Sequence, residues 1–238
     1  MRKVIVIGAT SGIGKELAKL FVEKGYTVGI TGRRRELLED LKKENPGSFI
    51  TSTFDITDTH TTIEKLADLT SELGGLDLLI VCSGTGDINT ELDFEIERKT
   101  IETNVIGFTN IVDWGFKYFD KQKLGHLVAI SSIGGLRGSR HAPSYNASKS
   151  YQMNYLEGLR QKSKHTKSKI YITDIRPGLV DTDMAKGDGL FWVEPVKKVS
   201  NQIIKAIEKR KDIAYVTSRW GIIARILKLL PRSLYNKM

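Results

Sequence analysis

Two residues four positions apart, Tyr145 and Lys149, could carry out proton transfer if they lie on a helix. At that spacing both side chains lie on one helix face. An ammonium near a phenol favours the phenolate and lowers the phenol's pKa from about 10 towards neutrality, which suits a general acid or base. Ser131 and Ser132 precede this pair at the end of a predicted strand.

A glycine-rich turn follows the first predicted strand and opens the first predicted helix. It reads Gly8-Ala-Thr-Ser-Gly12-Ile-Gly14. Glycines in such a turn let the backbone approach a pyrophosphate, and the free N–H groups of the helix start favour its negative charge. The sequence therefore predicts a phosphate-binding turn made of Gly8, Thr10, Ser11, Gly12, Ile13 and Gly14.

A parallel sheet would bring these residues to one edge. β-Branched runs alternate with helical patterns along the chain, and strands are expected at 3–7, 26–31, 49–54, 77–81, 126–130, 169–175 and 213–216. One long helix is expected at 95–119 and another at 145–162. Alternating strands and helices imply right-handed crossovers and helices on both faces. The predicted fold class is α/β, a Rossmann-type doubly wound sandwich with about seven parallel strands.

Length and composition fit one globular domain, residues 1–238. The single cysteine, Cys82, can form neither an intramolecular disulfide nor a metal cluster, so we expect no metal and a reducing, cytoplasmic location. The net charge is +9, but the basic residues are scattered and no nucleic-acid-binding signature accompanies them. We therefore expect no nucleic-acid partner.

The motifs together resemble those of the short-chain dehydrogenase/reductase family. The glycine spacing, Tyr145-Asn-Ala-Ser-Lys149 and the preceding Ser131-Ser132 follow in the family's order, and the resemblance covers nearly the whole chain. It implies hydride transfer between a nicotinamide and a carbonyl or alcohol carbon, with Tyr145 as general acid and base. Ser132 would hold the substrate oxygen, with Ser131 as the alternative. Lys149 would also bind the nicotinamide ribose, and Asn104 matches the family asparagine that holds a water in a proton relay.

The end of the second predicted strand bears on the choice of cofactor. An acid there would accept the adenosine ribose hydroxyl, but the chain has Arg33 and Arg34. Guanidinium groups bind phosphate with charge-assisted hydrogen bonds, so NADP(H) is favoured and NAD(H) is the alternative. The resemblance implies further cofactor contacts from Asp55, Ile56, Ser83, Gly84, Tyr145, Lys149, Pro177, Gly178, Val180 and Thr182.

Two positions depart from the family pattern. Ile7 stands where the family has a threonine, and Val81-Cys82-Ser83-Gly84 stands where it has Asn-Asn-Ala-Gly. In the family these polar groups tie the central strands together. Their joint replacement predicts one coordinated repacking, with Cys82 as a buried residue near the cofactor rather than a nucleophile.

The segment 183–194 occupies the family's substrate-lid position. Its residues Met184, Phe191 and Trp192 could cover an apolar substrate, or they could pack the lid onto the fold. Because basic residues lie between Ser132 and Tyr145, an anionic substrate is the alternative. The tail, 219–238, is too short and too charged to span a bilayer, and it could contact another subunit, cover the cleft or lie on a membrane surface.

Two alternatives bear on the function. Family members commonly pair through the long helices, so a homodimer or homotetramer is expected. The rival function is a non-catalytic, dinucleotide-binding, redox-responsive regulator, because fold alone does not establish activity. A pure binder has no need for Ser132, Tyr145 and Lys149 together, and their joint presence favours an enzyme.

Overall fold

One parallel sheet forms the centre of the computed structural model, which describes residues 2–185 and 191–236. Within these residues the sheet has seven strands in the order β3-β2-β1-β4-β5-β6-β7, and all neighbouring strands are parallel. The predicted Rossmann-type fold is therefore confirmed. The strands are β1 (Lys3–Ile7), β2 (Thr27–Gly32), β3 (Phe49–Thr53), β4 (Leu78–Val81), β5 (Leu124–Ile130), β6 (Lys169–Pro177) and β7 (Ile213–Val216).

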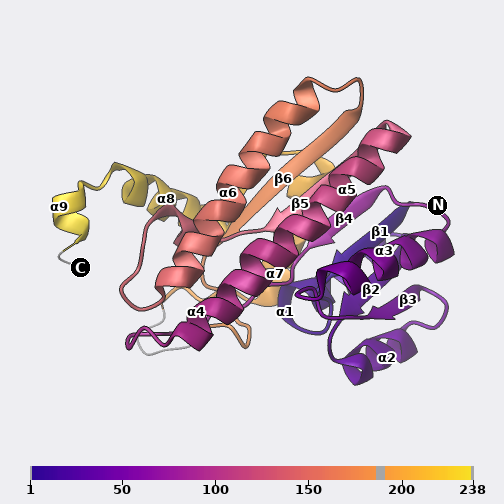
Figure 1. Ribbon diagram of the computed structural model, residues 1–238, viewed down its shortest axis with the longest axis horizontal. Coiled ribbons are helices and arrows are strands. Elements are labelled where there is room, and N and C mark those ends of the chain that lie inside the picture. The colour runs from indigo at the N-terminus through magenta and orange to yellow at the C-terminus, as the bar shows by residue number, and fades with distance from the viewer. Residues whose placement is uncertain (1, 186–190, 237–238) are drawn as a thin grey trace.

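Helices cover both faces of the sheet (Figure 1). One face packs against α1 (Gly12–Glu23), α2 (Arg35–Glu44) and α7 (Val196–Glu208). The other packs against α3 (Thr59–Leu73), α5 (Phe108–Gln122) and α6 (Pro143–Lys164). In β1, Val4 and Val6 join the first core cluster whereas Ile5 and Ile7 join the second. This two-sided burial explains why β1 reads as a continuous β-branched run.

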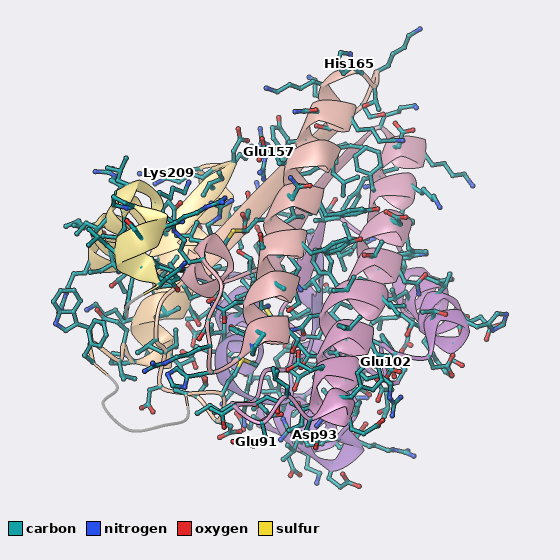
Figure 2. All side chains as sticks on the ribbon, turned by 60° about the vertical axis from the view of Figure 1, so that its left-hand side comes forward. Glu91, Asp93, Glu102, Glu157, His165 and Lys209 are labelled. Atoms are coloured by element: carbon teal, nitrogen blue, oxygen red, sulfur yellow. The ribbon has the colours of Figure 1, made fainter. Side chains whose placement is uncertain are left out.

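The long helix expected at 95–119 is interrupted. It consists of α4 (Phe94–Ile101), a π-helical segment (Glu102–Gly107) and α5. Gly107 lies close to the chain after β3, because an added Cβ would lie 2.7 Å from the Ile56 carbonyl oxygen. Figure 2 shows α5 and α6 side by side, with Glu102 near the lower end of the α4–α5 column. Hydrophobic periodicity cannot reveal one wider turn inside a continuous helix.

The tail forms two helices that the sequence did not predict, α8 (Ser218–Leu229) and α9 (Arg232–Tyr235), and residues 237–238 lie outside the described residues. Arg137 holds them, because its Nε donates to the Leu227 carbonyl at 2.8 Å and its Nη2 to the Leu230 carbonyl. In Figure 1 the two helices extend beyond the sheet on the side away from α3. Among the described helices, none is long and apolar enough to cross a membrane.

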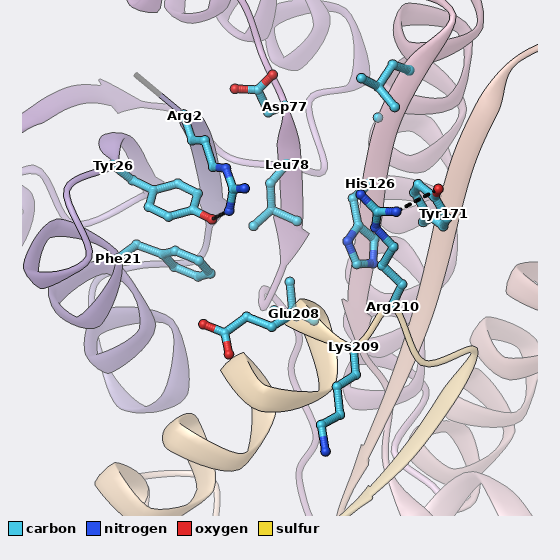
Figure 3. A pocket seen from close by; sticks show the side chains of 13 residues that line it. Arg2, Phe21, Tyr26, Asp77, Leu78, His126, Tyr171, Glu208, Lys209 and Arg210 are labelled. Carbon is cyan, nitrogen blue, oxygen red and sulfur yellow. Dashed lines mark hydrogen bonds between the residues drawn. The ribbon is translucent and has the colours of Figure 1, made fainter.

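A pocket lies at the amino edge of the sheet, opposite the edge where the glycine turn follows β1 (Figure 3). Arg2 and Arg210 line it, and each donates to a tyrosine hydroxyl, Tyr26 and Tyr171 respectively. His126 also lines it, is 9% exposed, and has its Nε2 2.8 Å from the Thr173 hydroxyl on β6. Burial, assisted by nearby Arg210, lowers the pKa of His126 to about 4.

The low pKa of His126 predicts an acid-sensitive stability. In the unfolded chain His126 has an ordinary histidine pKa of about 6.5. Between about pH 6.5 and about pH 4 the unfolded chain therefore binds more protons at this residue than the folded chain does. The free energy of unfolding should therefore fall as the pH is lowered through that window. His126→Gln, which cannot titrate, should show a shallower fall in urea unfolding measured at stepped pH. His60→Gln, at an exposed site on α3, is the control. Identical pH slopes for His126→Gln and wild type would contradict this.

Candidate active site

A cavity of about 580 Å³ opens at the carboxyl edge of the sheet. It lies where the chain leaves β1, β2, β3 and β4, which is the place where parallel α/β sheets bind ligands. Residues from five separate predicted segments meet there. The predicted site residues that line the cavity are Gly8, Thr10, Ser11, Ile13, Gly14, Arg33, Arg34, Asp55, Ile56, Ser83, Gly84, Thr182 and Met184.

The turn between β1 and α1 has room only for glycine at two points. Gly8 has φ +85°, and an added Cβ would lie 2.7 Å from the Ser83 backbone nitrogen. At Gly14 an added Cβ would lie 2.0 Å from the Gly8 carbonyl oxygen. The first turn of α1 contains no acid, and the Ser11 side chain does not cap this helix. The N–H groups at this helix start therefore suit an anionic ligand.

Arg34 lies over this turn. Its Nη2 donates to the hydroxyls of Thr10 at 2.7 Å and Ser11 at 2.9 Å. Arg33 instead approaches an acid, with its Nη1 3.4 Å from Asp55 Oδ2. Burial opposes ionisation of Asp55, but hydrogen bonds from Thr57 and the charge of Arg33 outweigh it and lower the pKa of this carboxyl. The two arginines thus differ, because only Arg34 lies over the glycine turn.

Ser132, Tyr145 and Lys149 lie together beside this cavity. Ser132 follows β5 and accepts a hydrogen bond from the Gly134 N–H at 3.0 Å. Tyr145 lies in the first turn of α6, which begins at Pro143, and its ring packs on Gly86 in the cavity wall. The Lys149 ammonium lies 5.8 Å from the centre of the Tyr145 ring.

Burial controls the protonation of both titratable groups. It raises the pKa of Tyr145, and the neighbouring Ser132 hydroxyl only partly opposes that rise. Burial also lowers the pKa of Lys149 to about 8, and the charge of Asp174 only partly opposes this. The sequence led us to expect a lowered pKa for Tyr145. The structure differs because the loss of water around the phenol outweighs an ammonium at this distance.

The comparisons with known proteins agree with this geometry. A family model for the short chain dehydrogenases matches residues 2–189. The chain belongs to the short-chain dehydrogenase family. An uncharacterized oxidoreductase of Myxococcus xanthus is 30% identical over 245 residues, which cover 99% of this chain and 95% of that protein. Dehydrogenase/reductase SDR family member 7B of Rattus norvegicus is 31% identical over 260 residues, covering 99% of this chain and 79% of that protein.

Solved structures show the same fold. A short-chain dehydrogenase from Streptomyces avermitilis has a TM-score of 0.82 at 23% identity and covers 95% of this chain and 91% of that chain. The closed form of a serine dehydrogenase complexed with NADP+ has a TM-score of 0.78 at 26% identity, with coverage of 86% and 88%. This short-chain dehydrogenase is therefore an oxidoreductase with a Rossmann-type fold.

Gln152 is a site residue that the sequence reasoning missed. The Lys149 ammonium donates to the Ile130 carbonyl at 3.1 Å and to Gln152 Oε1 at 3.0 Å. The Gln152 Nε2 then donates to the Asn104 backbone carbonyl at 2.9 Å. Gln152 is 1% exposed and follows Lys149 by three positions, on the same face of α6. An amide at a buried helix position was the signal that could have revealed it.

Asn104 joins three parts of the short-chain dehydrogenase. Its side chain exchanges two hydrogen bonds with the Thr85 backbone, accepting one at 2.9 Å and donating one at 2.6 Å. Its Nδ2 also donates to the Ser148 hydroxyl on α6 at 3.0 Å. The backbone carbonyl of Asn104, in the π-helical segment, accepts the amide of Gln152. That Asn104 holds a relay water stays a prediction; its carbonyl accepts one hydrogen bond, from the Gln152 amide.

Several predicted residues lie beside the cavity rather than in its described wall. Gly12 approaches Thr182, Pro177 ends β6, Gly178 packs on the Trp220 ring, and Val180 pairs with Glu194. Phe191 and Trp192 are exposed and contact Trp220, with ring centres 5.4 and 6.3 Å away. These two side chains therefore pack against the fold at Trp220 and do not line the described cavity wall. Positions 186–190 of the predicted lid lie outside the described residues.

The two departures from the family pattern meet on neighbouring strands, where Ile7 pairs with Val81 in one core cluster and Cys82 packs against the other cluster. Ile7 is fully buried, and its carbonyl accepts a hydrogen bond from the Cys82 N–H at 2.9 Å. Burial raises the pKa of the Cys82 thiol to about 12, so the reactive thiolate is disfavoured.

Among the described residues no group of His, Cys, Asp and Glu has a metal-binding arrangement.

The contacts of Gln152 predict opposite effects of two substitutions on Lys149. Gln152→Met removes an acceptor from the ammonium and should lower the pKa of Lys149 further below its present value of about 8. Gln152→Glu places a carboxylate there and should raise that pKa. Titration of the Lys149 resonance by NMR in lysine-labelled protein measures both shifts without any assay of turnover.

Gln122→Met provides a matched control. The Gln122 amide also bonds two backbone carbonyls, those of Leu76 and Leu124, but it lies at the amino edge of the sheet. Its loss should leave the Lys149 titration unchanged. Superimposable Lys149 titrations in wild type, Gln152→Met and Gln152→Glu would show that Gln152 does not act on this ammonium.

Proposed function

We propose that this short-chain dehydrogenase interconverts a carbonyl and a secondary alcohol by hydride transfer, with Tyr145 as its general acid and base. The observation that carries the proposal is the meeting of Ser132, Tyr145 and Lys149 beside a cavity that ends at the glycine turn. A non-catalytic regulator would need the turn alone. No observation on this chain favours that alternative.

The residues of the cavity fit a nicotinamide dinucleotide. The glycine turn leaves N–H groups for a pyrophosphate, and the Ser83 hydroxyl is buried in the cavity wall with no partner among the described residues. The bound nicotinamide would donate or accept the hydride. The cofactor would be held by the glycine turn and by the segments after the other strands, namely by Gly8, Thr10, Ser11, Gly12, Ile13, Gly14, Asp55, Ile56, Ser83, Gly84, Lys149, Pro177, Gly178, Val180 and Thr182.

In this mechanism the chain itself moves one proton. The Tyr145 phenol gives its proton to the carbonyl oxygen in reduction and becomes the phenolate, and in oxidation the phenolate takes a proton from the alcohol. Ser132 donates a hydrogen bond to the same oxygen as charge develops on it. Burial raises the pKa of Tyr145 and so favours the protonated phenol, the form that reduction requires.

The proposed cofactor is NADP(H). Support comes from Arg34, whose guanidinium joins the Thr10 and Ser11 hydroxyls at the place where a ribose phosphate could be bound. Arg33 is already paired with the Asp55 carboxylate, and that negative charge offsets the attraction of Arg33 for a phosphate. The serine dehydrogenase with a similar fold was solved with NADP+.

We further propose an apolar substrate and a lid at 183–194. Met184 lines the cavity and supports both, whereas the aromatic pair lies on Trp220. The single-domain organisation, the homodimer or homotetramer and the cytoplasmic location stay predictions.

Loss of the Tyr145 hydroxyl tests the reaction. In an NADPH oxidation assay over a panel of ketones and aldehydes, Tyr145→Phe should lower kcat by about 10²- to 10⁴-fold, because the proton donor is gone. NADPH binding should be retained. Tyr151→Phe is the control, since Tyr151 lies on the same helix and its hydroxyl bonds Thr109 instead. Undiminished turnover in Tyr145→Phe would refute the proposed role.

Loss of the Arg34 guanidinium tests the cofactor. Arg34→Ala should weaken NADPH binding by about 10- to 100-fold, which is the loss expected for a charged hydrogen bond, and leave NADH binding nearly unchanged. Fluorescence titration measures both dissociation constants. Arg35→Ala, one position on in α2, should change neither. Equal losses for NADPH and NADH would mean that Arg34 supports the turn rather than reads a phosphate.

A further inference from the structure

Helix α8 carries an exposed apolar ridge. Ile222, Ile226 and Leu229 are 60%, 54% and 83% exposed. Their spacing of four and three positions places them on one stripe of the helix. Trp220 and Ala224 lie on the opposite side and are buried. The helix is therefore apolar on its outer face as well as on the face that packs against the protein.

The charges around the ridge have one sign. Arg219 and Arg225 lie on either side of the stripe by helical spacing, and Lys228 and Arg232 follow. Arg219 lies 3.7 Å from the buried carboxylate of Glu194, whereas Arg225, Lys228 and Arg232 are exposed. No acidic residue follows Asp212 in the sequence. The side-chain charges that the chain itself supplies from 213 onward are therefore all cationic, and one of them, Arg219, is paired with Glu194.

Two exposed aromatics lie beside the start of α8. Phe191 and Trp192 are 54% and 48% exposed, and both contact Trp220 at the start of α8. The Arg219 guanidinium lies 5.9 Å from the centre of the Trp192 ring. We call Ile222, Ile226 and Leu229 together the α8 face.

The protein holds the α8 face outward. Arg137 binds the Leu227 and Leu230 carbonyls at the end of α8, and the Tyr235 hydroxyl donates to the Gly138 carbonyl. The helix therefore does not depend on an outside partner for its position, and the exposed stripe is fixed on the folded chain.

We propose that the α8 face binds the surface of an anionic lipid bilayer. The apolar ridge would enter the boundary between headgroups and acyl chains, and the arginine and lysine border would meet lipid phosphates. A second copy of this chain fits less well, because a two-fold contact would bring the two cationic borders together. The proposal does not depend on the reaction proposed above.

Vesicle sedimentation with the full chain tests this. The wild type should bind vesicles of phosphatidylcholine mixed with phosphatidylglycerol, and bind vesicles of phosphatidylcholine alone much more weakly. Arg225→Gln combined with Lys228→Gln should weaken binding to the anionic vesicles by roughly 25-fold, from about fivefold for each cation removed. Ile226→Asp combined with Leu229→Asp should abolish it, because the ridge can no longer leave water.

Leu124→Asp is the matched control for the ridge variant. Leu124 is 52% exposed at the amino edge of the sheet, so this change adds a charge to an exposed apolar site elsewhere. It should leave vesicle binding unchanged. The proposal is overturned if the wild type sediments with neither vesicle, or if it binds both equally. It is also overturned if the ridge variant alters only the oligomeric state by light scattering and leaves vesicle binding intact.

Discussion

A buried ammonium must find hydrogen-bond acceptors, and much of this site is arranged around that requirement. Lys149 is 4% exposed, and a charge so far from water is costly unless protein atoms replace its hydration. The Ile130 carbonyl at the end of β5 and the Gln152 amide supply two acceptors. Gln152 is in turn oriented by the Asn104 carbonyl. One charge thereby fixes β5, α6 and the π-helical segment relative to one another.

The same organisation continues on the far side of Lys149 through a second buried charge. Asp174 on β6 is fully buried, accepts the Ser131 hydroxyl at 2.5 Å and pairs with Arg176 at 2.6 Å. Arg176 reaches the Tyr215 hydroxyl on β7. The carboxylate offsets part of the effect of burial on Lys149, so the pKa of this lysine depends on strands that do not line the cavity. Such a buried polar network is stable only while every member is satisfied.

Local sequence patterns predicted the parts of this protein that depend on short-range constraints. A β-branched run such as Lys3–Ile7 has to be a buried strand, and glycines packed against backbone atoms at Gly8 and Gly14 have to form a tight turn. The spacing of Tyr145 and Lys149 placed them on one face of α6. These features need no knowledge of distant segments.

Contacts between distant segments could not be read in the same way. The amide of Gln152 bonds a carbonyl 48 residues away, in a π-helical segment that periodicity cannot distinguish from an ordinary helix. Phe191 and Trp192 have side chains suited to covering a substrate, but in the structure their rings contact Trp220. The end of α8 is held by Arg137, which lies 90 positions before Leu227 and donates to its carbonyl. In each case the deciding partner lies far away in the sequence.

A crystal structure of the chain grown with NADPH tests most directly whether the buried ammonium organises this site for a nicotinamide cofactor. The account predicts the pyrophosphate at the start of α1 and the nicotinamide beside Tyr145. It predicts that Lys149 keeps its bonds to the Ile130 carbonyl and Gln152 and directs its remaining N–H towards the ribose. A dinucleotide bound elsewhere, or Lys149 turned away from Gln152 in the complex, would contradict it.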